Sequence, residues 1–389
     1  MLDRVLRAKI HAPGGQSVTF VELFFDLVFV FALTEVTSFA AHHLDFEGVV
    51  RAAIVFWLIW WAWTQWTWAL NPADTEHGIV RVGTLLATAI AFIMAVSVGD
   101  AFEGNGGLWF VVPYIAVRLL GLGLYARVAS ERDQQLAAVQ AFALLSTFGL
   151  AAALAGGIVN EEARMWVWLG AIVLDIVAAG VAGRFESWHL HVGHFAERHG
   201  LFVIIALGES LIVAAAAITG AERSAEVMGV AIGAVAVTCL LWWVYFGWLQ
   251  AALESRLAAT VGSAQSMLAR DAYSLLHFPL ILSIVGVAVA FEEMAAHPSA
   301  SVPSAVLIAL GLGIGGYLWA SAAVWARASR KVLWVRLLAP ISFAPMLFFA
   351  TDAIAPWVLA IVTALLATVV IVEELRPPSG TPSSATMPT

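Results

Sequence analysis

Long apolar runs separated by short polar segments occupy most of this 389-residue chain. The runs are about 20 residues long, the length at which a helix crosses a hydrocarbon layer of about 30 Å. This pattern predicts an all-α integral membrane protein with about twelve transmembrane helices. They are expected near residues 19–42, 49–70, 78–98, 107–128, 135–158, 164–183, 199–219, 225–250, 272–291, 303–326, 332–351 and 355–374.

The composition is typical of a membrane protein and argues against nucleic acid as a binding partner. Hydrophobic residues make up 61% of the chain and charged residues 12%, whereas soluble domains are about half apolar and about a quarter charged. The net charge of -8 is spread over short loops, so no nucleic-acid footprint is expected and membrane lipids are the predicted surroundings. The single cysteine, Cys239, excludes an intramolecular disulfide and a cysteine-rich metal site. No cofactor is predicted.

Lysines and arginines are distributed unevenly between alternate loops. If the N-terminus is inside, fifteen of them fall in inner segments, and only Arg51, Arg164 and Arg223 in outer ones. Cationic loops resist translocation, so this asymmetry predicts that both termini are cytoplasmic. Residues 1–18 would form a cytoplasmic N-terminal segment. Residues 375–389, rich in Pro, Ser and Thr, would form a disordered cytoplasmic tail.

Short motifs recur in the same order in the two halves of the chain. The pairs are Phe-Val-Glu at 20–22 with Phe-Ala-Glu at 195–197, Ala-Leu-Thr-Glu at 32–35 with Ala-Leu-Gly-Glu at 206–209, and Leu-Ile-Trp-Trp at 58–61 with Leu-Leu-Trp-Trp at 240–243. They predict two six-helix repeats, 19–183 and 184–374, which are parallel because six is even. In such folds the working site usually lies between the halves. Chance similarity between apolar helices is the alternative.

Carboxylates inside the predicted spans are informative, because each costs about 2.5–3.5 kcal/mol at the bilayer centre and usually faces protein or water. Glu22 and Asp26 lie one turn apart on one face of the first helix. Glu35, nine residues after Asp26, falls on roughly the opposite face. Glu22 is either an interfacial or a functional carboxylate. For Asp26 and Glu35, a structural ion pair and a functional role both remain open.

Glu209 is the carboxylate expected nearest to the bilayer centre, about 15 Å along its helix from Gly200. Gly208 beside it would leave room for a neighbouring helix or water, and the Ser210 hydroxyl could donate a hydrogen bond to it. We therefore expect Glu209 to carry more of the function than any other single residue.

The densest polar stretch of the chain, residues 188–199, precedes the seventh predicted helix. If this stretch is helical, His194, Glu197 and Arg198 lie within one turn, as in a salt-bridged anchor or a metal site. The stretch has no H-E-x-x-H motif, and its histidine spacing does not follow one helical face. No metal site is predicted, although metal binding by the His189–His199 cluster stays open.

Three further polar residues lie inside predicted helices: Arg118, Asp175 and His277, the last just before Pro279. Arg118 needs a counter-ion, and the carboxylates of the first or seventh helix are the expected partners. The glycines of the tenth helix, around Gly313, are expected to allow close helix contact rather than to bind phosphate.

The segments Phe20–Ala32 and His194–Glu209 strongly resemble the bacterial low temperature requirement A family. The resemblance covers nearly the whole chain apart from the two tails. It implies a multi-spanning bacterial inner-membrane protein linked by name to growth in the cold, but no substrate, cofactor or catalytic residue. The signature positions carried over are Glu22, Asp26, His194, Glu197, Arg198, Gly200 and Glu209.

The favoured function is a secondary transporter or permease of an unidentified small molecule or ion, coupled to protons through Asp26, Glu35 and Glu209. One alternative is an intramembrane, metal-dependent, lipid-modifying enzyme that uses His194, Glu197 and Asp26. A second is a non-catalytic membrane sensor or scaffold. The absence of a nucleophile elbow or zinc motif from the sequence favours a protein that is not an enzyme.

Overall fold

A computed structural model describes residues 10–12, 15–130, 133–184, 190–219, 222–349 and 352–376. Within these ranges the regular structure is helical, and each of the twelve predicted segments corresponds to a helix or to a group of consecutive helices. The predicted tail beyond Arg376 and the cations of the first nine residues lie outside the described part. The described residues fall into two compact units.

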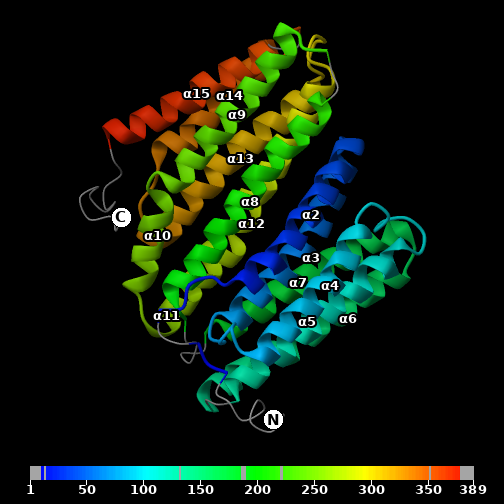
Figure 1. The fold of residues 1–389 in the computed structure, drawn as a ribbon, viewed down its shortest axis with the longest axis vertical. Helices are drawn as coiled ribbons and strands as arrows, with labels where there is room; N and C mark the ends of the chain where they lie inside the picture. The colour runs from blue at the N-terminus through cyan, green and yellow to red at the C-terminus, as the bar shows by residue number, and fades with distance from the viewer. Residues whose placement is uncertain are drawn as a thin grey trace. The chain divides into compact units, whose positions relative to one another are not determined.

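Unit 1 takes its residues from 1–39, 50–199 and 260–270. It holds most of α2 and α3, all of α4 to α7, the first two turns of α8, and α11, and consecutive helices from α4 to α7 pack side by side (Figure 1). Their bounds are α2 Phe20–His42, α3 Phe46–Leu70, α4 Gly78–Val96, α5 Gly106–Ala129, α6 Asp133–Ile158, α7 Glu161–Ala182, α8 Val192–Ile218 and α11 Gly262–Leu268.

Unit 2 takes its residues from 40–49, 200–259 and 271–389. It holds the rest of α8, and it packs α12 against α13, α9 against α15, and α13 against α14. The bounds are α9 Ala225–Phe246, α10 Leu249–Ala258, the π-helical segment η1 Ala269–Leu275, α12 His277–Ala296, α13 Ser304–Ser329, α14 Trp334–Phe349 and α15 Ala355–Leu375.

Local sequence signals set several helix ends. Asn160 caps α7 by accepting a hydrogen bond from the Ala163 N–H at 3.0 Å, and Ser224 caps α9 from the Val227 N–H at 3.2 Å. Helix α13 ends at Ser329, and the next residue, Arg330, has a φ of 58°, in the left-handed region that stops a helix.

Glycines bring α12 and α13 close together, as the sequence predicted for this region. A Cβ atom on Gly313 would lie 2.8 Å from the Val287 side chain and 2.9 Å from the Ser283 carbonyl oxygen, and the Cα of Gly313 lies 3.5 Å from a Cβ placed on Gly286. No larger residue fits at Gly313 without moving a backbone, so the contact between the two helices depends on it.

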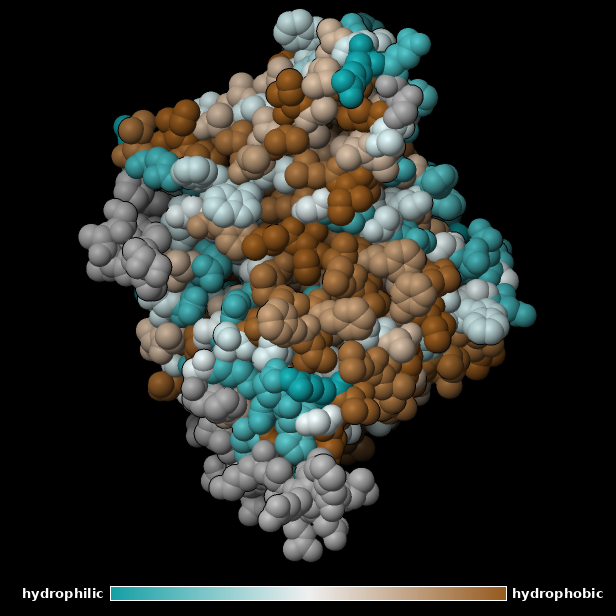
Figure 2. Space-filling model, viewed as in Figure 1, coloured by the Kyte–Doolittle hydropathy of each residue, from teal (hydrophilic) through white to brown (hydrophobic). Residues whose placement is uncertain are grey.

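Among the described residues, eleven helical spans are long and apolar enough to cross a membrane. The remaining predicted span, α14, has 16 residues and contains Pro340 and Pro345, so it falls short of the roughly 20 residues that a perpendicular crossing needs. Apolar side chains cover much of the face in Figure 2, and many large ones point outward, among them Leu119, Ile212 and Ile308, each more than half exposed. A surface of this kind suits lipid rather than water. The chain is therefore an all-α, multi-pass membrane protein.

Two predicted boundaries were wrong. The seventh helix was expected from residue 199, but α8 begins about two turns earlier, at Val192. The first two turns of α8 carry polar side chains, so a search for apolar runs does not include them. The ninth helix was expected over residues 272–291, but η1 occupies its first turn and α12 runs from His277 to Ala296. At the junction the Leu276 N–H donates to the Asp271 carbonyl five residues back at 3.0 Å. Pro279 has no N–H to continue the usual pattern, and wide turns of this kind adjust the backbone at such points.

Candidate functional site

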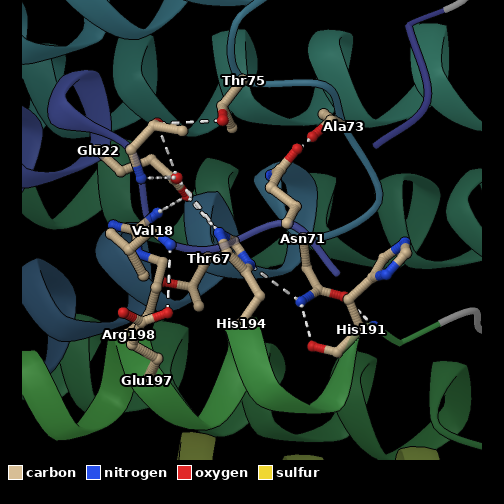
Figure 3. A network of polar contacts seen from close by, with 12 residues as sticks. Val18, Glu22, Thr67, Asn71, Ala73, Thr75, His191, His194, Glu197 and Arg198 are labelled. Carbon is tan, nitrogen blue, oxygen red and sulfur yellow. Dashed lines mark hydrogen bonds and ion pairs between the residues drawn. The ribbon is translucent and has the colours of Figure 1, made fainter. Parts of the chain in front are cut away.

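The main polar network of unit 1 joins the first turns of α2 to the first turns of α8. His194 and Arg198 are four residues apart on α8 and point toward Glu22 (Figure 3). Arg198 donates from Nη1 to Glu22 Oε1 at 3.1 Å and from Nη2 to Asp26 Oδ1. His194 Nε2 lies 3.0 Å from Glu22 Oε1. All four side chains are at most 3% exposed, so two carboxylates share one guanidinium away from solvent.

Trp63 of α3 covers this ion pair. Its indole N–H donates to Asp26 Oδ1 at 2.7 Å, and the Arg198 guanidinium carbon lies 5.5 Å from the centre of its ring. One side chain therefore satisfies a carboxylate lone pair and also supplies a cation–π contact. The edge of His199 meets the same indole, with ring centres 5.1 Å apart.

Asn71, just beyond the end of α3, holds His194 from the other side. Its Oδ1 accepts from the His191 N–H at 2.8 Å, and its Nδ2 donates to the His191 carbonyl at 2.9 Å. Nδ2 also lies 3.2 Å from His194 Nδ1 (Figure 3). The amide is thus fixed by two backbone groups and directs its remaining hydrogen at the imidazole.

Glu22 receives further donors from its own helix start. The Thr19 N–H and hydroxyl each lie 3.0 Å from Glu22 Oε2, and Thr75 lies 3.0 Å from the Thr19 hydroxyl. Glu197, the third residue predicted for this cluster, is exposed and instead accepts from the Val18 N–H at 3.2 Å. The helix thus brings His194 and Arg198 together and turns Glu197 away from them.

Glu35 and Glu209 are not part of this network. Glu35 is half-buried further along α2, and Glu209 is 2% exposed in unit 2. The expectation that Ser210 donates to Glu209 is wrong, because its hydroxyl donates to the Leu207 carbonyl at 2.7 Å. A Cβ on Gly208 would meet no atom within 4 Å, so this glycine leaves open space, as expected, rather than a tight helix contact.

Arg118 and Asp175 form a separate buried pair in unit 1, which corrects the expected partner of Arg118. Asp175 of α7 accepts from Nη1 at 3.1 Å and from Nη2 at 3.0 Å, and both residues are at most 1% exposed. Tyr114 accepts from Nη1 at 2.5 Å, and Gln65 accepts from Nε. Every nitrogen of the Arg118 guanidinium has a hydrogen-bond acceptor, as expected for an ion pair with a structural role.

His277 lies fully buried in unit 2, between two tyrosines. Its Nδ1 lies 2.8 Å from the Ala272 carbonyl and its Nε2 lies 2.7 Å from the Tyr245 hydroxyl. Because a carbonyl only accepts, Nδ1 carries the hydrogen, and in the neutral imidazole Nε2 then accepts from Tyr245. Tyr273 stacks on the imidazole with ring centres 5.2 Å apart. The neutral imidazole is satisfied at both nitrogens.

Sequence reasoning missed a third buried ion pair, between Arg336 of α14 and Glu373 of α15. Nε and Nη2 donate to the two Glu373 oxygens at 2.7 Å each, and the Trp248 indole N–H also donates to Glu373 at 3.0 Å. Arg336 had been counted as a loop cation although it lies inside a predicted helix. Its apolar neighbours in the sequence were the signal that could have identified it.

The predicted histidine cluster does not form one constellation. His189 lies outside the described residues, and His191 takes part through its backbone. Within the described ranges, no group of three or more His, Cys, Asp or Glu side chains is placed to hold a metal ion. The candidate site considered next is the Glu22–Asp26–His194–Arg198 network, which is called the charged network below.

Membrane-spanning helices that enclose such a network define a polytopic membrane protein with a buried, ionisable site. Beyond this class, the model of the family described as bacterial low temperature requirement A protein matches residues 17–372, and the chain belongs to that family. It is 27% identical to an uncharacterized protein of Rhizobium meliloti (strain 1021), over 92% of this chain and 88% of that protein. No solved structure matches the chain significantly.

Proposed function

We propose that this protein is a secondary transporter or permease that couples the movement of a small molecule or ion to protons. The observation that carries the proposal is the charged network, which places two carboxylates, one arginine and one histidine inside membrane-spanning helices. Burying such groups in a membrane is expensive, and where they persist they mark proton relays and substrate pathways.

The setting that we propose for this function is the bacterial inner membrane, with both termini in the cytoplasm. Arg164, Arg198 and Arg336, which were counted with the loops, are buried inside helices, and removing them leaves the excess of cationic residues on the predicted inner side. Two parallel six-helix repeats, 19–183 and 184–374, complete the proposal. The motifs repeated in order support this arrangement, which is common among transporters.

The enzyme and the sensor have less support. The metal-dependent enzyme would use His194, Glu197 and Asp26 together, whereas Glu197 is exposed and turned to Val18 while the other two are buried. A sensor or scaffold would need no exchangeable charge. The two acidic groups placed on one guanidinium favour transport over both.

Proton movement in liposomes tests the proposal. The full chain is reconstituted with an entrapped pH-sensitive dye, and pools of amino acids, organic acids, sugars and monovalent cations are added outside under an imposed potential. We expect one pool to drive proton movement in the wild type and in Asp352→Asn, an exposed aspartate that receives the same chemical change, but not in Asp26→Asn. Proton movement that equals that of protein-free liposomes with every pool would contradict the proposal.

A further inference from the structure

The protonation of the charged network can be worked out one group at a time, beginning with His194. The Asn71 amide is oriented by its two bonds to the His191 backbone, so its Nδ2 hydrogen faces His194 Nδ1 at 3.2 Å. Nδ1 must therefore be an acceptor, and the imidazole hydrogen lies on Nε2. If His194 were an imidazolium, its Nδ1 hydrogen would point at the hydrogen of the Asn71 Nδ2. His194 is thus neutral and donates to Glu22.

Glu22 is the ionised carboxylate of the network. Its oxygens face the Arg198 guanidinium, the His194 Nε2–H, and the backbone N–H and hydroxyl of Thr19. The guanidinium, the Nε2–H and the backbone N–H can only donate, whereas the Thr19 hydroxyl, which also lies 3.0 Å from the Thr75 hydroxyl, could either donate or accept. The charge of Glu22 balances that of Arg198.

Asp26 is left without a balancing charge. Its Oδ1 accepts from the Trp63 indole and from Arg198, but among the residues that the structure describes none donates to Oδ2, which is fully buried. The other titratable side chain nearby, His199, turns its Nδ1 to the Phe195 carbonyl at 2.9 Å. An ionised Asp26 would leave the network with one uncompensated negative charge in a buried site, which is strongly unfavourable.

We propose that Asp26 is a proton-binding site, with the proton on Oδ2 while Glu22 and Arg198 remain charged. The bound proton neutralises the network, and its release leaves two anions competing for one guanidinium. A proton on His194 would remove its bond from Asn71, and a proton on Glu22 would neutralise the carboxylate that faces the Arg198 guanidinium, the His194 Nε2–H and the Thr19 N–H. The physiological meaning of the site rests on the proposed transport function, but its protonation can be measured without transport.

Infrared difference spectroscopy of the full chain in lipid tests the assignment. Spectra of the wild type and the variants are subtracted at about pH 7, where exposed carboxyl groups are already ionised. We expect a carboxyl C=O band in the wild type that shifts in D2O and is lost in Asp26→Asn. The band should persist in Asp352→Asn, which makes the same change at an exposed position.

Isotope labelling keeps the test independent of how the variant folds. Wild-type protein that carries carbon-13 in its aspartate side-chain carboxyls should show the same band at lower frequency. Among the aspartates whose burial the structure describes, Asp175 is the other buried one, and it is paired with both terminal nitrogens of Arg118, so an aspartate band reports Asp26. A spectrum without an aspartate component, or a band that survives in Asp26→Asn, would overturn the assignment. If the Asp26 band is present but the liposomes show no proton-coupled flux, the proposed transport function is refuted and the assignment of the proton to Asp26 stands.

Discussion

The buried pair of Arg118 and Asp175 gives the sharpest stability prediction. In Asp175→Asn, one amide oxygen replaces two anionic oxygens that now accept at 3.1 and 3.0 Å, and the amide NH2 faces a guanidinium N–H. Removing one partner of a fully buried ion pair costs about 3–5 kcal/mol, because the other charge stays buried without compensation. At about 2–4 °C per kcal/mol, this lowers the unfolding temperature by roughly 6–20 °C, with the lower part of that range expected for a chain of this length.

Thermal unfolding followed by tryptophan fluorescence, at one scan rate and in one detergent, measures this loss. The double variant Arg118→Met/Asp175→Asn removes both charges and should recover at least half of it. The control is Glu76→Gln at the exposed Arg81–Glu76 pair, for which the change should stay below about 1 kcal/mol. If Asp175→Asn unfolds at the same temperature as this control, or if the double variant is no more stable than Asp175→Asn, the reasoning from desolvation is wrong.

Three further predictions concern other parts of the molecule. Tyr245→Phe removes the donor to His277 Nε2 and should cost about 1–3 kcal/mol in the same thermal scan; an unchanged melting temperature would show that the imidazole has another partner. Glu209→Gln should insert and express normally but fail to complement a cold-growth defect, and full complementation would reduce Glu209 to a structural residue. Reporter fusions at the loop near Glu161 should read outside and those near Arg330 inside, and the reverse reading at Arg330 would refute the twelve-span topology.

The membrane architecture could be predicted from the sequence because run length and hydropathy are local properties. The α3 span is an example: its apolar residues alone place it, and the helix begins at Phe46, three residues before the predicted start. The start of α8 could not be placed in this way. Its first turns are polar in sequence, and they are stable there because Glu22 and Asp26 accept from His194 and Arg198, a pairing between segments more than 170 residues apart.

Pairing between helices was the part that sequence reasoning could not supply. Arg118 was assigned a carboxylate of the first or seventh predicted helix, but its partner Asp175 comes from the sixth, because α5, α6 and α7 pack in succession. Periodicity shows which face of a helix a residue occupies but not which neighbour covers that face. Trp63 and Asn71 were overlooked for the same reason, since an indole or an amide has no charge to attract attention until its partner is known.

The wide turn of η1, Ala269–Leu275, has a consequence for how this family can vary. A turn with hydrogen bonds to the fifth residue back contains one residue more than an ordinary α-helical turn. Deleting one residue here would restore the ordinary pattern and keep the side chains of the flanking helices in phase. The same deletion in α13 before Gly313 would rotate every later side chain by about 100° and remove Gly313 from its contact with α12. Within the helical segments, a one-residue gap in a chain of this family is therefore expected at η1 rather than inside α13.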